Sequence, residues 1–196
     1  MKYKIASRND VFRYSLHPHK ERALVISATD KYSPPAKILQ NPQYNGIMAT
    51  KRVKFDDVSL GRPNCITKED AKEIAKFIKR HKDSQYDLLI VNCEVGVCRS
   101  AGICAAIMRY MGHDYKQLFA SKTFKPNIGC FKLLCEALGV QVSPKELEEL
   151  RALNKQVWDE RTKRESKVFA MHALKSVSAG HIIRQLNMFI TEHFFF

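Results

Sequence analysis

With 196 residues, 45% of them hydrophobic, and a formal net charge of +13, the chain can form one globular domain of ordinary size with an appendage. The amino terminus lacks an apolar signal region, no stretch is long and apolar enough to span a bilayer, and no Cys-X2-Cys pair indicates zinc. We therefore expect a cytoplasmic protein whose six cysteines are free thiols.

Two strands are predicted in the first third of the chain. Residues 23–27 are mostly apolar and lead into Pro34 and Pro35, where the chain cannot be helical. A second strand is predicted over residues 46–50 and continues as residues 52–55.

A helix and a buried strand follow. Thr67 suits the cap of a helix, because apolar residues recur at helical spacing after it. Residues 86–92 form a short apolar run typical of a strand with both faces covered. Residues 100–111 are small and apolar at helical spacing until Gly112 stops the helix. Strands that alternate with helices predict an α/β fold, in which helices flank a central, mainly parallel sheet.

The loop between that strand and that helix, Cys93-Glu-Val-Gly-Val-Cys-Arg99-Ser100, has the clearest chemistry of the chain. The first amides of a helix lack intrahelical partners and, together with the helix dipole, form a site that suits phosphate. Gly96 lets the backbone turn its N–H groups inward. The phosphate-binding residues predicted in this way are Glu94, Val95, Gly96, Val97, Cys98 and Arg99.

The side chains of Cys93 and Arg99 also suit an anion. Loop amides and the Arg99 charge stabilise a thiolate, and such surroundings can lower the pKa of a cysteine from about 8.5 to about 3.5–7.5. The guanidinium offers a rigid fork of donors for two phosphate oxygens. Four other cysteines are expected to be buried hydrophobic side chains, namely Cys98, Cys104, Cys130 and Cys135.

A change of composition after Val142 divides the chain into a main domain, residues 1–143, and a helical extension, residues 144–196. The extension begins with a helix predicted from Ser143 to about residue 164. A second helical stretch is predicted over about residues 167–188. No motif there carries chemistry. Packing on the core is the expected role, with subunit pairing or target binding as alternatives.

The loop and two other segments together resemble the cysteine-based protein tyrosine and dual-specificity phosphatases. Their phosphate-binding loop is Cys-X5-Arg followed by a hydroxyl residue, between a hydrophobic strand and a small-residue helix. Residues 52–58 resemble the strand end that supplies the family's general-acid aspartate. Residues 125–136 resemble its Pro-Asn-X-Gly-Phe-type segment. The similarity covers about residues 20–140 and implies that residues 1–143 are the catalytic domain.

The resemblance implies a phosphomonoester hydrolase that forms a phosphocysteine intermediate and needs no cofactor or metal. Cys93 would be the nucleophile, and Arg99 with the loop amides would hold the phosphate oxygens. Asp57 would be the general acid, with Asp56 as the alternative. Ser100 would stabilise the thiolate leaving group when the intermediate breaks down.

Two asparagines lie in the segments that resemble the family, Asn92 and Asn127. The family usually has histidine before the nucleophile, whereas this chain has Asn92. We therefore expect a less depressed pKa of the Cys93 thiol and slower turnover. Asn127 is expected to cap a helix, with a contact to the phosphate loop as the alternative.

The positive charge indicates anionic partners. Most of the excess lies within residues 1–143, where it would concentrate phosphorylated proteins, phosphoinositides or RNA 5′ phosphates. The alternative is simple solubility, with a solvated helix face that carries Lys72, Lys76, Lys79 and Lys82.

The expected substrate is a phosphorylated protein, at phosphotyrosine and also at phosphoserine or phosphothreonine. The alternatives are a phosphate-binding module with weak turnover, and an RNA 5′-phosphatase or other nucleic-acid-binding protein.

Overall fold

The computed structural model describes residues 1–82 and 84–168. The chain divides into two units, Met1–Lys155 and Gln156–Phe196. The helical stretch predicted over about residues 167–188 lies almost entirely outside the described residues. The domain boundary after residue 143 stays a prediction.

A four-stranded parallel sheet forms the centre of the first unit. In spatial order its strands are β1 (Lys2–Ala6), β4 (Leu88–Asn92), β2 (Ala23–Thr29) and β3 (Ile47–Lys54). The two central strands, β4 and β2, are buried along their whole length, which explains their almost continuous apolar sequences. The predicted α/β fold with a parallel sheet is confirmed.

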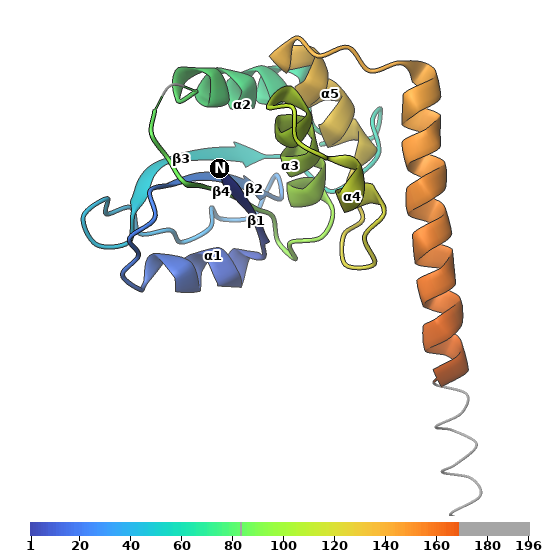
Figure 1. Cartoon of the computed structure of the whole chain (residues 1–196), viewed down its shortest axis with the longest axis horizontal. Helices are drawn as coiled ribbons and strands as arrows, with labels where there is room; N and C mark the ends of the chain where they lie inside the picture. Colours follow the sequence, from blue (N-terminus) through green and yellow to red (C-terminus); the bar gives the residue numbers. More distant parts are fainter. Residues whose placement is uncertain (83, 169–196) are drawn as a thin grey trace, which may run out of the picture. The chain divides into compact units, whose positions relative to one another are not determined.

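Helices cover both faces of this sheet (Figure 1). Alternate residues of a strand point to opposite faces, so Val25 joins the smaller core beneath α1 and Ile26 joins the larger core beneath the other helices. A short helix, α4 (Lys116–Phe119), follows α3. The remaining helices are α1 (Arg8–Ser15) on one face and, on the other, α2 (Lys68–Arg80), α3 (Arg99–Tyr110) and α5 (Ile128–Leu138).

Local sequence explains where most of these helices begin. Ser7 caps α1 and Thr67 caps α2, each in a capping box with an aspartate three residues later. Asn127 caps α5 through its side-chain oxygen. Helix α3 differs, since no side chain in the described part of the chain caps it. Its first amides are therefore available to another acceptor.

Residues 144–155 of the first unit and residues 156–168 of the second unit are helical, as predicted from the sequence. Within the first unit, Leu147 and Leu150 of this segment are buried in the larger core. Within the second unit, Arg161 pairs with Glu165 one turn later, with Nε and Oε1 2.7 Å apart. Among the described residues, no helix has the length and apolar character needed to cross a bilayer.

Candidate active site

The Cys93 loop lies at the carboxyl ends of three neighbouring strands. Asn92 ends β4 and is level in register with Ala6 of β1 and Ser27 of β2. Cys93 follows directly, and residues 94–98 lead to the first turn of α3. Ligands of parallel α/β sheets bind at this edge. The strand, loop and helix predicted from the sequence are all present.

The Cys93 thiol is enclosed by hydrogen-bond donors. The residue is 2% exposed, its Sγ accepts a hydrogen bond from the Gly96 amide at 3.2 Å, and the Ser100 Oγ lies 3.2 Å from the same Sγ. Burial raises the pKa of this thiol. The hydrogen bonds from the Ser100 hydroxyl and from the amides of Ser100, Gly96 and Val97 together outweigh burial, so the pKa is lowered from its ordinary value. The loop therefore favours a thiolate.

The Arg99 side chain is buried, with 3% of its surface exposed. Its Nη1 donates to the Phe55 carbonyl at 2.6 Å, and its Nη2 pairs with the Asp30 carboxylate at 2.7 Å. Its buried Nε has no hydrogen-bond partner among residues 1–82 and 84–168. Because a guanidinium carries five N–H donors, donors remain for phosphate oxygens. Asp30, which the sequence did not suggest as a site residue, fixes the orientation of the Arg99 guanidinium.

The two aspartates after β3 have different surroundings. Asp56 accepts hydrogen bonds from the Lys31 amide at 2.9 Å and from the Asn64 side chain at 3.1 Å, and the Lys31 amide is the main cause of its lowered pKa. Asp57 lies against the Cys93 loop instead. The pKa of the Cys98 thiol is raised to about 12, mainly because the thiol is buried and next because the Asp57 charge is near. Asp56 therefore stabilises the loop after β3 through its hydrogen bonds, whereas Asp57 faces the Cys93 loop.

Asn127 connects Asp57 to the Cys93 loop. Its Nδ2 donates to Asp57 Oδ1 at 2.9 Å and to the Val58 carbonyl at 3.3 Å. Its backbone amide donates to the Cys98 carbonyl at 3.1 Å, while its Oδ1 caps α5. The residue thus has both of the roles that were considered for it.

Gly96 packs against the backbone that joins β1 to α1. Its φ is +79°, and a Cβ at this position would lie 2.6 Å from the Ala6 carbonyl carbon and from the Ser7 nitrogen. Arg8 donates through its amide to the Glu94 carbonyl at 3.2 Å and pairs with the Glu94 carboxylate at 3.1 Å. The start of α1 therefore holds the outer part of the loop. A side chain at position 96 would push the two segments apart.

The other loop positions differ in exposure. Val95 is 73% exposed, and Val97 is half-buried with its carbonyl bonded to the Lys125 amide at 3.1 Å. Cys98 is also half-buried, which corrects the expectation that it is a buried hydrophobic side chain, because it lies on the loop at the cap of α3. All six cysteines are free thiols, and those that are buried as expected are Cys104, Cys130 and Cys135.

Asn92 is fully buried and directly precedes Cys93. Neither its Oδ1 nor its Nδ2 has a hydrogen-bond partner in the described part of the chain. The groups that lower the pKa of Cys93 are the Ser100 hydroxyl and loop amides rather than the Asn92 side chain. The expected effect of this asparagine on the thiol stays a prediction.

A scan against protein-family models finds no match, and a search of curated proteins finds none either. Among solved structures, human DUSP28 matches over 81% of this chain and 94% of its own, with 13% identity and a TM-score of 0.41. Tk-PTP in the active form matches over 79% of this chain and 92% of its own, with 13% identity and a TM-score of 0.37. PTPMT1 in complex with PI(5)P matches over 82% and 94%, with 16% identity and a TM-score of 0.37.

These solved structures are cysteine-based dual-specificity and tyrosine phosphatases. With TM-scores below 0.5 and identities of 13–16%, the likeness carries no argument about this chain. The function is therefore inferred from the site residues of this chain.

Proposed function

We propose that this protein is a phosphomonoester hydrolase that forms a phosphocysteine intermediate on Cys93. The observation that carries the proposal is the Cys93 thiol, enclosed by loop amides and the Ser100 hydroxyl at the start of α3, with a lowered pKa. An anion-binding helix end and a thiolate nucleophile thus occupy one loop. Arg99, in the same loop, supplies fixed positive charge for the phosphate.

In the first step, the Cys93 thiolate attacks the phosphorus atom in line with the leaving oxygen. The S–P bond forms as the P–O bond to the leaving group breaks. Loop amides and the remaining N–H groups of Arg99 donate to the equatorial oxygens, where charge is redistributed. Asp57 gives its proton to the leaving oxygen, so that the product leaves as a neutral alcohol.

In the second step, water attacks the phosphorus atom of the phosphocysteine. The Asp57 carboxylate accepts a proton from this water, and the S–P bond breaks to release inorganic phosphate. The sulfur leaves as a thiolate, which the Ser100 hydroxyl stabilises from 3.2 Å. The thiolate and the protonated Asp57 are then ready for another cycle.

We take the substrates to be phosphorylated proteins, at phosphotyrosine and also at phosphoserine or phosphothreonine. The resemblance of the Cys93 loop and the net charge of +13 support this class. A panel of phosphopeptides, phosphoinositides and 5′-triphosphate RNA tests it against the lipid and RNA alternatives. The cytoplasmic location also stays a prediction.

Hydrolysis of an aryl phosphate tests the reaction itself. Wild-type protein should release phosphate, and Cys93→Ser should not. The control is Cys65→Ser, because Cys65 lies outside the loop and is only half-buried. If the wild-type protein binds orthovanadate without hydrolysing the ester, it is a phosphate-binding module rather than an enzyme.

The choice between the two aspartates has its own test. Asp57→Asn should lower kcat by about 10²–10⁴-fold for an alkyl phosphate, whose leaving group needs a proton. The decrease should be smaller for an aryl phosphate with an acidic leaving group. Asp56→Asn should weaken the loop held by Lys31 and Asn64, and so act mainly on stability. The reverse pattern would assign the acid to Asp56.

A further inference from the structure

Arg8, the first residue of α1, joins three segments of chain at the edge of the Cys93 loop. Its Nη1 lies 3.1 Å and 3.2 Å from the two carboxylate oxygens of Glu94. Its Nη2 donates to the Pro34 carbonyl at 2.6 Å and to the Pro35 carbonyl at 3.2 Å. The mechanism described above gives this arginine no role.

The contacts of Arg8 use the shape of a guanidinium. This group is planar and presents its N–H donors in fixed directions, whereas an ammonium is a compact charge on a flexible stem. The two carbonyls that accept from Nη2 therefore fix the plane of the group, and Nη1 is held against Glu94. The backbone of Pro34 and Pro35 thus orients Arg8, and Arg8 in turn orients the Glu94 carboxylate.

The loop that supplies these carbonyls, residues 30–35, is also tied to the site at its other end. Asp30 pairs with Arg99 there, with Oδ1 and Nη2 2.7 Å apart. Between the two ends, Tyr32 is 86% exposed. One end of the loop thus binds Arg99, and the other end binds Arg8.

Glu94 brings a negative charge to a loop for which we propose a phosphate dianion as ligand. It directly follows Cys93, and consecutive Cα atoms are about 3.8 Å apart. Its side chain is 24% exposed, so water screens the charge incompletely. Asp30 already offsets part of the Arg99 charge. An unpaired Glu94 carboxylate would therefore oppose binding of the dianion.

Arg8 supplies the compensating charge. Its side chain is 25% exposed, so most of this ion pair is shielded from water on both sides. Hydrogen bonds between charged partners are stronger than those between neutral ones. Removal of one partner from such a pair leaves the other charge uncompensated, whereas removal of both does not. The charge of Glu94 and its contact with Arg8 can therefore be separated by experiment.

We propose that Arg8 is a positioning residue of the Cys93 site, which gives the loop its affinity for a phosphate dianion by neutralising Glu94. The proposal rests on the proposed function and adds to the site a residue from outside the loop. The Pro34 and Pro35 carbonyls keep the guanidinium in place. Arg8 acts through Glu94 and makes no contact with the reacting atoms.

The test measures the dissociation constant of tungstate, an inert dianion that resembles phosphate, by calorimetry with the full chain at low salt. Arg8→Gln should weaken binding about tenfold, because the Glu94 charge is then uncompensated. Glu94→Gln should bind tungstate more tightly than wild-type protein. The double variant Arg8→Gln/Glu94→Gln should return to within about twofold of wild type. The effect of Arg8→Gln should decrease as salt increases.

A merely structural role of the contact predicts another pattern. Loss of the contact from either side would then loosen the loop, so Arg8→Gln, Glu94→Gln and the double variant would all weaken tungstate binding. Arg8→Lys separates charge from geometry, because it keeps the charge and loses the fork. Its dissociation constant should stay within about threefold of wild type. Equal weakening in Arg8→Lys and Arg8→Gln would overturn the proposal.

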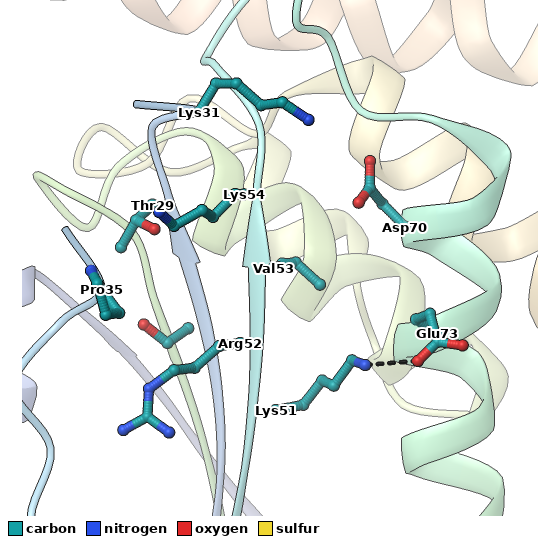
Figure 2. A pocket seen from close by; sticks show the side chains of 10 residues that line it. Thr29, Lys31, Pro35, Lys51, Arg52, Val53, Lys54, Asp70 and Glu73 are labelled. Atoms are coloured by element: carbon teal, nitrogen blue, oxygen red, sulfur yellow. Dashed lines mark hydrogen bonds and ion pairs between the residues drawn. The ribbon is translucent and has the colours of Figure 1, made fainter. Parts of the chain in front are cut away.

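The matched control is a second ion pair, which Figure 2 shows between β3 and α2. Lys51 Nζ lies 2.6 Å from Glu73 Oε2, and the Lys51 side chain is 24% exposed, close to the value for Arg8. Lys51→Gln leaves Glu73 without this partner, outside the Cys93 loop. Tungstate affinity should not change. A loss as large as that of Arg8→Gln would assign the effect to net charge and overturn the proposal.

The two proposals fail in different ways. Wild-type protein that binds no tungstate and shows no Cys93-dependent hydrolysis of an aryl phosphate would overturn the proposed function. Tungstate binding that is the same in wild-type protein and in the Arg8 and Glu94 variants would overturn the role of Arg8 and leave the phosphatase intact.

Discussion

The side-chain amide of Asn127 donates a hydrogen bond to the Asp57 carboxylate, with Nδ2 and Oδ1 2.9 Å apart. The same side chain caps α5 and its backbone holds the Cys98 carbonyl. One residue therefore fixes Asp57, the proposed general acid, relative to the loop that contains Cys93. This arrangement predicts that catalysis and helix capping can be separated at position 127.

Asn127→Ser should keep the cap, because serine is a good N-cap residue, but its side chain is too short to reach Asp57. We expect the free energy of unfolding to change little, while kcat/KM for an alkyl phosphate falls about tenfold or more through misplacement of the acid. Asn127→Ala should lose about 1 kcal/mol of stability in addition. Urea unfolding and initial rates measure the two effects. Full activity in Asn127→Ser would show that Asp57 needs no such partner.

Ser100→Ala should raise the pKa of the Cys93 thiol, because it removes a hydrogen-bond donor to the sulfur. A thiol reacts with iodoacetamide only when ionised, so the alkylation rate rises with pH through the pKa. The midpoint should lie below the ordinary pKa of a cysteine thiol in wild-type protein and move upward in the variant. Cys98, with a pKa raised to about 12, should stay unmodified over this range and serves as the internal control. Equal midpoints would contradict the role given to Ser100.

Asn92→His should lower the pKa of the Cys93 thiol further, because a protonated imidazole adds positive charge where a neutral amide now lies. Alkylation of Cys93 at mildly acidic pH should become faster, and phosphate release should follow. The measurement is the same pH profile, with Asn92→Gln as the control that changes size without charge. An unchanged pH profile in Asn92→His would show that residue 92 does not influence the reactivity of the Cys93 thiol.

Gly96→Ala should destabilise the protein by at least about 2 kcal/mol, because its left-handed backbone is strained for alanine and the added Cβ would press on Ala6 and Ser7. Gly61→Ala is the matched control, since its φ is +85° but no atom of the neighbouring described residues that could clash lies within 4 Å of an added Cβ. It should cost only about 1 kcal/mol. Denaturant unfolding compares the two. Equal losses would mean that the contact between the loop and β1 is loose.

Much of the site could be predicted because its supporting elements have strong local patterns. The central strand β4 is buried throughout and therefore reads as an apolar run. The helix α3 is almost entirely buried, and most of its residues are small or apolar. The loop between them places Cys93 and Arg99 at the end of a strand and the start of a helix. These features depend on neighbours in sequence, so one sequence suffices to find them.

The first strand and the first helix have weaker sequence patterns than β4 and α3. β1 is an edge strand with alternately exposed and half-buried residues, and α1 has only eight residues. The Ser7 capping box is the sequence feature that could have located α1. Neither element has the apolar content that marks a core segment.

The partners of Arg99 and Asp57 come from distant segments. Asp30 lies after β2, and Asn127 lies before α5. Asp30 could have been proposed as a site residue, because it follows a parallel strand at the same edge as Cys93. The pairing of Ser27 with Arg52 depends on the register between β2 and β3. No turn joins these strands directly, so local sequence does not fix that register.

The most direct test of the covalent mechanism is mass spectrometry of protein denatured rapidly during turnover of an aryl phosphate. A phosphate adduct should be found on the peptide that contains Cys93, and it should accumulate in Ser100→Ala, where departure of the thiolate is slower. Cys93→Ser protein should carry no adduct and release no phosphate. Turnover without an adduct on Cys93, or hydrolysis that persists in Cys93→Ser, would contradict the mechanism.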